Sequence, residues 1–297
     1  MLRPVTLLIL LGFIWGSGYS IARFAMTHGV MPLGYAFWQS WGPSLVLFLF
    51  LLLKRIKIHW DQKHLVFYLI TALLGIVIPN TNIYFTAAHL PAGILAVVVN
   101  TVPIISYPLA LIFTLERFNL LRIIGVVIGI LGIMCLVLPK ASLPTIHDAP
   151  WILSTLISPF SFACCAIFSS KYRPANTDSI SLSMGMLLFS SIILTPLVFT
   201  MHEFYSLLPP YNIASYIILL EIVLSSIGYI LFFELLRTAG PVYYSLVGGL
   251  VGLTGIFWGY VIFHEALNIW TSIAVILILS AIFLVTIKMN AYIKKYD

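Results

Sequence analysis

Long apolar runs follow one another along the whole chain and are separated by short polar gaps. A helix rises about 1.5 Å per residue and the hydrocarbon core of a bilayer is about 30 Å thick, so a run of about 20 residues can cross it. A helix also satisfies its own backbone hydrogen bonds, which hydrocarbon requires. The pattern predicts ten membrane-spanning helices, at residues 5–23, 33–53, 65–86, 92–113, 120–138, 151–170, 180–200, 213–236, 242–263 and 269–287.

The composition of the chain excludes a soluble fold. Of the 297 residues, 61% are hydrophobic and 8% are charged, whereas about a quarter of the residues in a soluble domain are charged. The first apolar run lacks a convincing signal-peptide cleavage site and continues through Trp15 and Tyr19, so we interpret it as the first span. The polar gaps between the spans are too short to form a separate domain.

Basic residues lie mainly in the gaps between the apolar runs. A net charge of +6 would suggest nucleic-acid binding in a soluble protein, but membrane topology explains it here, and we expect no nucleic-acid partner. If the amino terminus is cytoplasmic, every Lys and Arg except Arg23 and Lys140 faces the cytoplasm. The positive-inside rule therefore predicts a multi-pass protein of the cytoplasmic (inner) or plasma membrane with both termini in the cytoplasm.

The two halves of the chain resemble each other. A Glu-x-x-Asn motif at residues 116–119, before the fifth predicted helix, recurs at residues 265–268, before the tenth, at an offset of 149 residues. Near the same offset, the polar end of the first helix at Arg23 corresponds to that of the sixth helix at Lys171. Five helices per repeat place the second copy upside down, and inverted repeats are typical of transporters.

The sequence contains no parts of a known enzyme site. It has no Gly-Lys phosphate loop, no His-Glu-x-x-His pair and no Gly-x-Ser-x-Gly turn. Its three cysteines, Cys135, Cys164 and Cys165, lie in apolar segments without metal-binding spacing, so we expect no disulfide, metal or other cofactor. We therefore predict that the protein is not an enzyme, and the missing nucleotide motif favours a secondary carrier over a pump.

Glu221 is the most informative single residue. It lies about eight residues into the eighth predicted helix, where an ionised side chain costs at least about 2.5 to 3.5 kcal/mol. A carboxylate at that depth is either protonated or faces a wet cavity. It could bind a substrate amine or couple protons to transport, and the alternative is a structural hydrogen bond to a neighbouring helix.

Other polar and aromatic side chains lie within the predicted spans. By depth, Gln39, Asn80, Asn100 and Glu221 could share one level, with Thr101 beside Asn100. Hydrogen bonds between helices are the alternative explanation for these polar residues. Aromatic rings could stack on a planar or cationic substrate, although Trp and Tyr also gather at membrane interfaces. The aromatic candidates are Trp15, Tyr19, Tyr84 and Trp258.

Several segments resemble the drug/metabolite transporter superfamily, in particular its ten-helix EamA-type members. These segments are Trp15-Gly16-Ser17, the stretch 87–103, the stretch 116–132 and its counterpart 265–281. The resemblance implies an all-α membrane protein with ten transmembrane helices in two inverted five-helix repeats around a central cavity, to which Ser17 would contribute. It places the repeats at residues 1–139 and 150–289, followed by a short cytoplasmic tail at 290–297. Cys164-Cys165 departs from the tryptophan or small residue that is more usual in the sixth helix.

The sequence and the resemblance together predict a secondary transporter that moves a small metabolite by alternating access. An amino acid or a derivative is the favoured substrate, and export is favoured over uptake. Alternatives are uptake or exchange of another metabolite, such as a nucleoside-type cofactor, or a non-carrier such as a channel or lipid scramblase. Small-residue spacings such as Gly12 to Gly16 are explained by packing within one chain, so a monomer is favoured and a homodimer is left open.

Overall fold

The computed structural model describes the chain except for residues 1–3, 138–148, 176, 245, 266–267 and 287–297. Lys140, the predicted tail and the last residue of the fifth and tenth predicted helices lie outside the described residues. The part that is described contains helices and no strand. Eight helical spans are long and apolar enough to cross a membrane, and the shorter apolar helices Leu120–Leu136 and Val247–Phe263 bring the number to the predicted ten.

The first repeat runs from α1 to α7 and the second from α8 to α13. The elements of the first repeat are α1 (Pro4–Thr27), α2 (Pro32–Lys54), α3 (Gln62–Ala72), the π-helix η1 (Leu73–Val77), α4 (Ile78–Ala87), α5 (Ala92–Val99), α6 (Val102–Ile112) and α7 (Leu120–Val137). Those of the second are α8 (Ala149–Thr155), α9 (Ile157–Tyr172), α10 (Ser179–Thr200), α11 (Ile213–Tyr244), α12 (Leu246–Phe263) and α13 (Ile269–Thr286).

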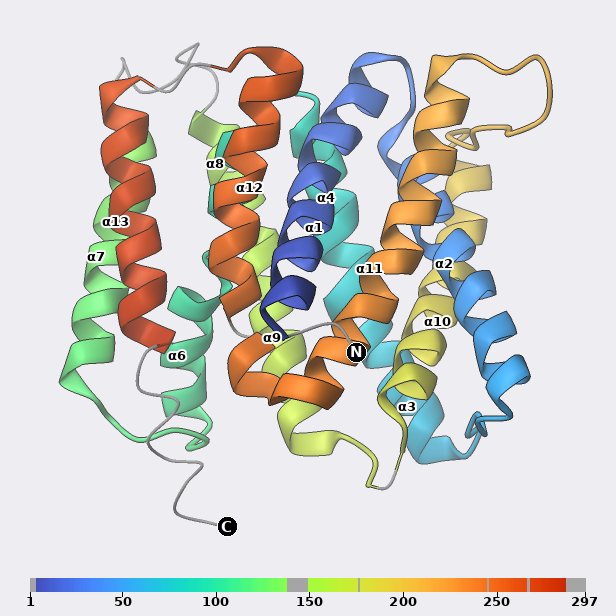
Figure 1. The fold of residues 1–297 in the computed structure, drawn as a ribbon, viewed down its shortest axis with the longest axis horizontal. Helices are drawn as coiled ribbons and strands as arrows, with labels where there is room; N and C mark the ends of the chain where they lie inside the picture. Colours follow the sequence, from blue (N-terminus) through green and yellow to red (C-terminus); the bar gives the residue numbers. More distant parts are fainter. Residues whose placement is uncertain (1–3, 138–148, 176, 245, 266–267, 287–297) are drawn as a thin grey trace.

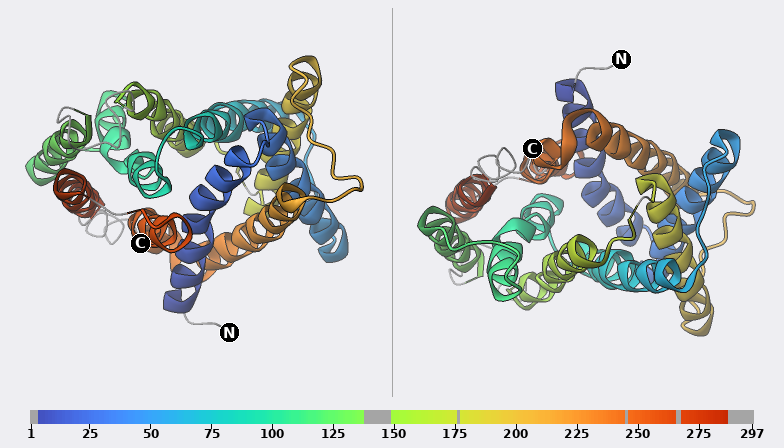
Figure 2. Two further views of the ribbon diagram at one scale, coloured as in Figure 1. Left: turned by 90° about the horizontal axis from the view of Figure 1, so that it is seen from above. Right: turned by 90° about the horizontal axis from the view of Figure 1, so that it is seen from below.

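The helices form an elongated bundle, with α7 and α13 packed together at one end and α2 and α10 at the other (Figures 1 and 2). The first helix begins and the last helix ends at the same face of the bundle (Figure 1). We call this the terminal face and the opposite one the far face. The charge pattern predicts that the terminal face is cytoplasmic.

Loop contacts follow the inverted arrangement of the repeats. At the far face, the backbone N–H of Leu33 at the start of α2 donates to the Glu203 carboxylate at 2.9 Å, in the loop that follows α10. At the terminal face, the Ser181 hydroxyl at the start of α10 donates to the Lys57 carbonyl at 3.2 Å, in the loop that follows α2. Each of these two helices thus begins against the loop that follows the other.

Three predicted helices are interrupted rather than continuous. The third span contains the π-helix η1, the fourth is divided between α5 and α6, and the sixth between α8 and α9. Each interruption lies about four residues before a proline, namely Pro79, Pro103 and Pro159. Proline has no N–H for the carbonyl four residues earlier and its ring crowds that carbonyl, which weakens the helix there.

The end of the eighth helix differs from the prediction. The predicted eighth helix ends at residue 236 and the ninth begins at 242, but α11 continues through Gly240 and Pro241 to Tyr244 as one helix. A proline removes a single backbone donor, so a helix can bend at it without ending. In Figure 1 the lower end of α11 turns along the terminal face before the chain enters α12.

Candidate functional site

Glu221 is a buried carboxylate deep in the bundle. It is the ninth residue of α11, about 12 Å along the helix from its first residue, and it is 7% exposed. The Ser225 hydroxyl, one turn later on the same helix, donates to Glu221 Oε1 at 2.6 Å. Among the described residues, no basic side chain forms an ion pair with Glu221. A substrate cation or a proton could supply the missing positive charge.

Two tyrosines from the first repeat lie beside this carboxylate. Tyr35 on α2 is 1% exposed, and its hydroxyl faces Glu221 without a conventional hydrogen-bond partner among the described residues. Its ring meets that of Tyr84 on α4 edge to face, with 4.7 Å between centroids. Tyr84 was a candidate from the sequence and Tyr35 was not. The missed signal is the spacing of Tyr35 from Gln39, since residues four apart share a helix face.

Asn100 connects the interrupted fourth span to the same region. It follows α5, where its side-chain Nδ2 donates to the Ala96 carbonyl at 2.7 Å and to the Tyr19 hydroxyl at 3.3 Å. Tyr19 lies in turn within electrostatic reach of Tyr84. A chain of neighbouring side chains therefore runs from Asn100 through Tyr19 and Tyr84 to Glu221. Interrupted helices at this depth are typical of transporter binding sites.

Gln39 and Asn80 form a second polar link between α2 and α4. Asn80 Nδ2 donates to Gln39 Oε1 at 3.1 Å. Gln39 lies one turn from Tyr35, and Asn80 one turn from Tyr84, so the amide pair and the tyrosine pair follow the same two helix faces. Of the four residues expected at one level, the structure joins Gln39 and Asn80 directly by a hydrogen bond.

The remaining candidates have more local surroundings. The Trp15 ring packs against Phe232, with 5.7 Å between centroids. The Ser17 hydroxyl donates to the Ile14 carbonyl at 2.7 Å, and the Thr101 hydroxyl to the Val98 carbonyl at 2.7 Å, each within its own helical turn.

Trp258 lies apart from the group around Glu221. Its Nε1 donates to the Phe13 carbonyl at 3.0 Å. Its ring contacts those of Phe13 and Phe257, both of which are exposed on the surface of the bundle. The structure therefore places Trp258 at the outer seam between α1 and α12.

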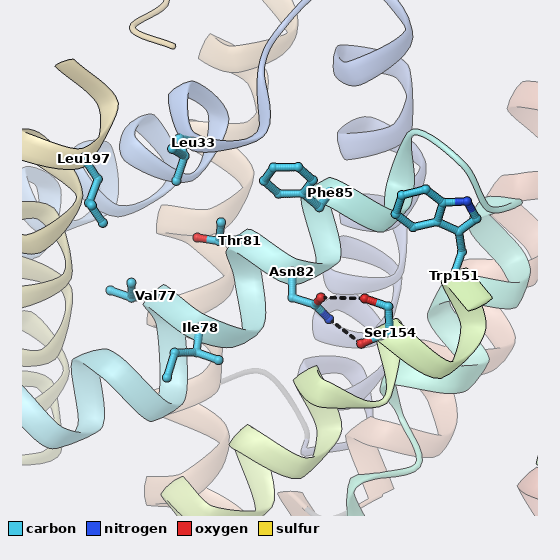
Figure 3. Close-up of a pocket in the computed structure, with 9 residues that line it drawn as sticks. All are labelled: Leu33, Val77, Ile78, Thr81, Asn82, Phe85, Trp151, Ser154 and Leu197. Carbon is cyan, nitrogen blue, oxygen red and sulfur yellow. Dashed lines mark hydrogen bonds between the residues drawn. The ribbon is translucent and has the colours of Figure 1, made fainter. Parts of the chain in front are cut away.

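A cavity of about 380 Å³ lies beside α4 (Figure 3). Its lining residues are mainly apolar: Leu33, Val77, Ile78, Thr81, Asn82, Phe85, Trp151, Ser154 and Leu197. Asn82 Nδ2 donates to the Ser154 carbonyl at 3.0 Å and the Ser154 hydroxyl donates back to Asn82 Oδ1 at 3.3 Å. None of the sequence candidates lines this cavity, and it contains no charged group. We therefore assign the candidate site to the buried carboxylate and its tyrosines.

One cluster of potential metal ligands lies at the terminal face, where His59, Asp61 and His64 offer ligand atoms within 4.8 Å of one another. Asp61 caps α3 by accepting from the backbone N–H groups of Lys63 and His64. The His64 ring contacts the Asp61 carboxylate through Nδ1 and the Thr177 hydroxyl through Nε2 at 2.8 Å. Because both ring nitrogens have protein partners, the cluster fits a helix cap better than a metal site.

Comparison with known proteins gives matches over most of the chain. The model of the EamA-like transporter family matches residues 2–138 and 149–287. The chain is 22% identical to the uncharacterized transporter YvbV of Bacillus subtilis (strain 168), over 97% of this chain and 93% of that protein. It is 25% identical to protein PecM of Dickeya dadantii (strain 3937), over 68% of this chain and 67% of that protein.

One solved structure shares the fold. A protein described only as a crystal structure superposes with a TM-score of 0.66 at 14% sequence identity, over 97% of this chain and 98% of that chain. This likeness concerns the fold alone.

Proposed function

Because this chain belongs to the EamA-like transporter family and is a membrane transporter, we propose that it carries a small amphipathic metabolite, an amino acid or a derivative, by alternating access. Export is the favoured direction. The observation that carries the proposal is the Glu221 carboxylate, buried without a basic partner among the described residues. A substrate amine would complete its charge balance.

The surroundings of Glu221 suit such a substrate. The rings of Tyr35 and Tyr84 offer flat apolar surface for a side chain, and their hydroxyls offer hydrogen bonds to polar groups. Asn100 and Tyr19 add an amide and a further hydroxyl. A mixture of one carboxylate with aromatic and amide groups supports an amphipathic metabolite over a sugar or an inorganic ion.

Counterflow in proteoliposomes tests this proposal. Vesicles containing purified protein are loaded with unlabelled candidate amino acids, and the saturable entry of the same labelled compound is measured. We expect saturable counterflow with at least one amino acid or amine derivative. Movement of only sugars or inorganic ions would contradict the substrate class. Flux that does not saturate, or lipid flipping without counterflow, would favour a channel or a scramblase.

The role of Glu221 can be tested with two neighbouring serines. Ser225 donates to Glu221, whereas Ser226 donates to the Ile222 carbonyl at 2.6 Å on its own helix, and both are buried. Replacing Ser225 with Ala removes a hydrogen bond to the carboxylate, so the half-saturation concentration should change. The matched Ser226→Ala variant should transport like the wild type.

A further inference from the structure

The far face carries a polar network that joins three spans of the two repeats. The Arg23 guanidinium on α1 contacts the Glu265 carboxylate beyond the end of α12. Glu265 also accepts from the backbone N–H groups of Ala92 at 2.8 Å and Gly93 at 3.0 Å, the first residues of α5. A carboxylate at the positive end of a helix dipole and beside a guanidinium is well stabilised. The Glu265 carboxylate therefore links the three spans at this face.

Packing under this network is tightest at the far face. A Cβ atom added to Gly259 would lie 3.1 Å from Gly93 N, and one added to Gly255 would lie 2.2 Å from Ala96 Cβ. On the same face of α12, two turns from Gly255 towards the terminal face, a Cβ added to Gly248 would lie 3.6 Å from Asn100 Oδ1. The spans α5 and α12 thus approach most closely near the network, and the contact between them loosens towards the end of α5.

Glu116 occupies the position that corresponds to Glu265 in the first repeat, at the offset of 149 residues. It pairs with Arg122 of its own repeat at 3.1 Å, and its side chain is 38% exposed, compared with 13% for Glu265. Lys171, the counterpart of Arg23, is exposed and forms no ion pair with a carboxylate among the described residues. Glu116 and Lys171 therefore do not form the ion pair between repeats that Arg23 and Glu265 form.

We propose that Arg23, Glu265 and the start of α5 form a far-face gate that is closed in this structure. Its inverted counterpart is the pair Glu116 and Lys171 at the terminal face, whose side chains are not paired with each other here. When the far-face gate opens, Glu116 leaves Arg122 and pairs with Lys171, so that the two faces close in turn. This inference rests on the proposed alternating access, but it can be tested without knowing the substrate.

Distances between spin labels report which face is open. A far-face pair of labels is placed at the exposed residues His89 and Val261, on the two sides of the Glu265 contact. A terminal-face pair is placed at the exposed residues Leu115 and Tyr172. The labels are introduced into full-length protein in lipid nanodiscs, with the three native cysteines replaced by serine.

When the gate is weakened, the distance between the labels should increase at the far face and decrease at the terminal face. Glu265→Gln removes the charge that holds Arg23 and α5, so the population with a long far-face distance should rise about tenfold, while the terminal-face distance shortens. Adding Lys171→Gln should reverse that shift, because Lys171 forms no ion pair among the described residues and would pair with Glu116 only when the far-face gate is open. Glu203→Gln, which alters a carboxylate on the same face outside the network, should leave both distances unchanged.

Other outcomes would overturn the gate. It is wrong if Glu265→Gln leaves both distance distributions unchanged, or if Lys171→Gln increases the shift instead of reversing it. If Glu265→Gln does not fold, Arg23→Gln removes the ion pair and the contact of the guanidinium with the Phe263 ring, keeps the bonds from α5 to Glu265, and must give the same direction of shift. Failure of every amino acid in the counterflow assay, with the distances moving as expected, would reject the substrate and leave the gate standing.

Discussion

The rings of Tyr35 and Tyr84 meet edge to face at 4.7 Å between centroids, which brings two hydroxyls from different helices of the first repeat towards Glu221 of the second. The contact joins α2, α4 and α11 at the carboxylate. Tyr35 is thus a residue of the first repeat that lies directly beside Glu221. The inverted repeats thus meet at the one buried acid that has no basic partner among the described residues.

Tyr35→Phe removes the hydroxyl and keeps the ring, so it tests the contribution of the hydroxyl alone. The Tyr35 hydroxyl has no conventional hydrogen bond in the described part of the chain, so its removal should leave the melting temperature unchanged or raise it. Apparent substrate affinity should fall about tenfold if the hydroxyl binds substrate or the carboxylate. Tyr68→Phe, at another fully buried tyrosine, is the matched control and should not change the affinity. A Tyr35→Phe variant with wild-type affinity would remove this hydroxyl from the site.

The Gln39 and Asn80 pair should be visible as a coupling energy. In a double-mutant cycle with Gln39→Ala and Asn80→Ala, the two changes should be non-additive by about 0.5–1.5 kcal/mol of unfolding free energy, since either one breaks the 3.1 Å bond. Unfolding in detergent measures the cycle. A coupling of zero would mean that lipid or water competes fully for these amides.

Two glycines of α12 offer a matched test of helix packing. Alanine at Gly255 would place a Cβ 2.2 Å from Ala96 Cβ, whereas alanine at Gly249 would meet no atom within 4 Å. Both changes gain about 0.5–1 kcal/mol from the lower flexibility of alanine, so their difference isolates the clash. Gly255→Ala should be less stable than Gly249→Ala by about 1–3 kcal/mol. Equal melting temperatures would contradict the close approach of α5 and α12.

The charge pattern predicts the membrane orientation, and reporter fusions can measure it. A fusion at Asp297 should be active only with a cytoplasmic reporter, and a fusion in the loop after α10 at Glu203 only with a periplasmic or extracellular one. The reverse pattern would show that the terminal face is outside. It would also exchange the sides on which the proposed gate is closed and open.

The sequence predicts the number of helices well because each span must bury a long apolar run, and that requirement is local. It predicts interruptions less well, because the effect of a proline depends on its neighbours. Pro103 and Pro159 follow breaks, whereas Pro43 lies inside the continuous helix α2. The end of α11 was misplaced for the same reason.

The candidate site was predictable only in part. A buried acid stands out in any apolar run, which is why Glu221 was found from the sequence. Tyr35 was missed because tyrosine is common in membrane spans, and only the fold shows that its hydroxyl faces a carboxylate 186 positions later in the chain. The pairing of Glu265 with Arg23 and with the start of α5 likewise depends on contacts between repeats.

The most direct test of the central claim is the initial rate of uptake into proteoliposomes by wild type and Glu221→Gln, between about pH 5 and pH 8, at matched protein incorporation. Glutamine keeps the shape and the hydrogen bond with Ser225 but removes the charge. If the carboxylate binds a substrate amine or couples protons, Glu221→Gln should lose transport or its pH dependence, with an unchanged melting temperature and with Ser226→Ala behaving as the wild type. Superimposable rate profiles for wild type and Glu221→Gln would contradict a functional charge at this position.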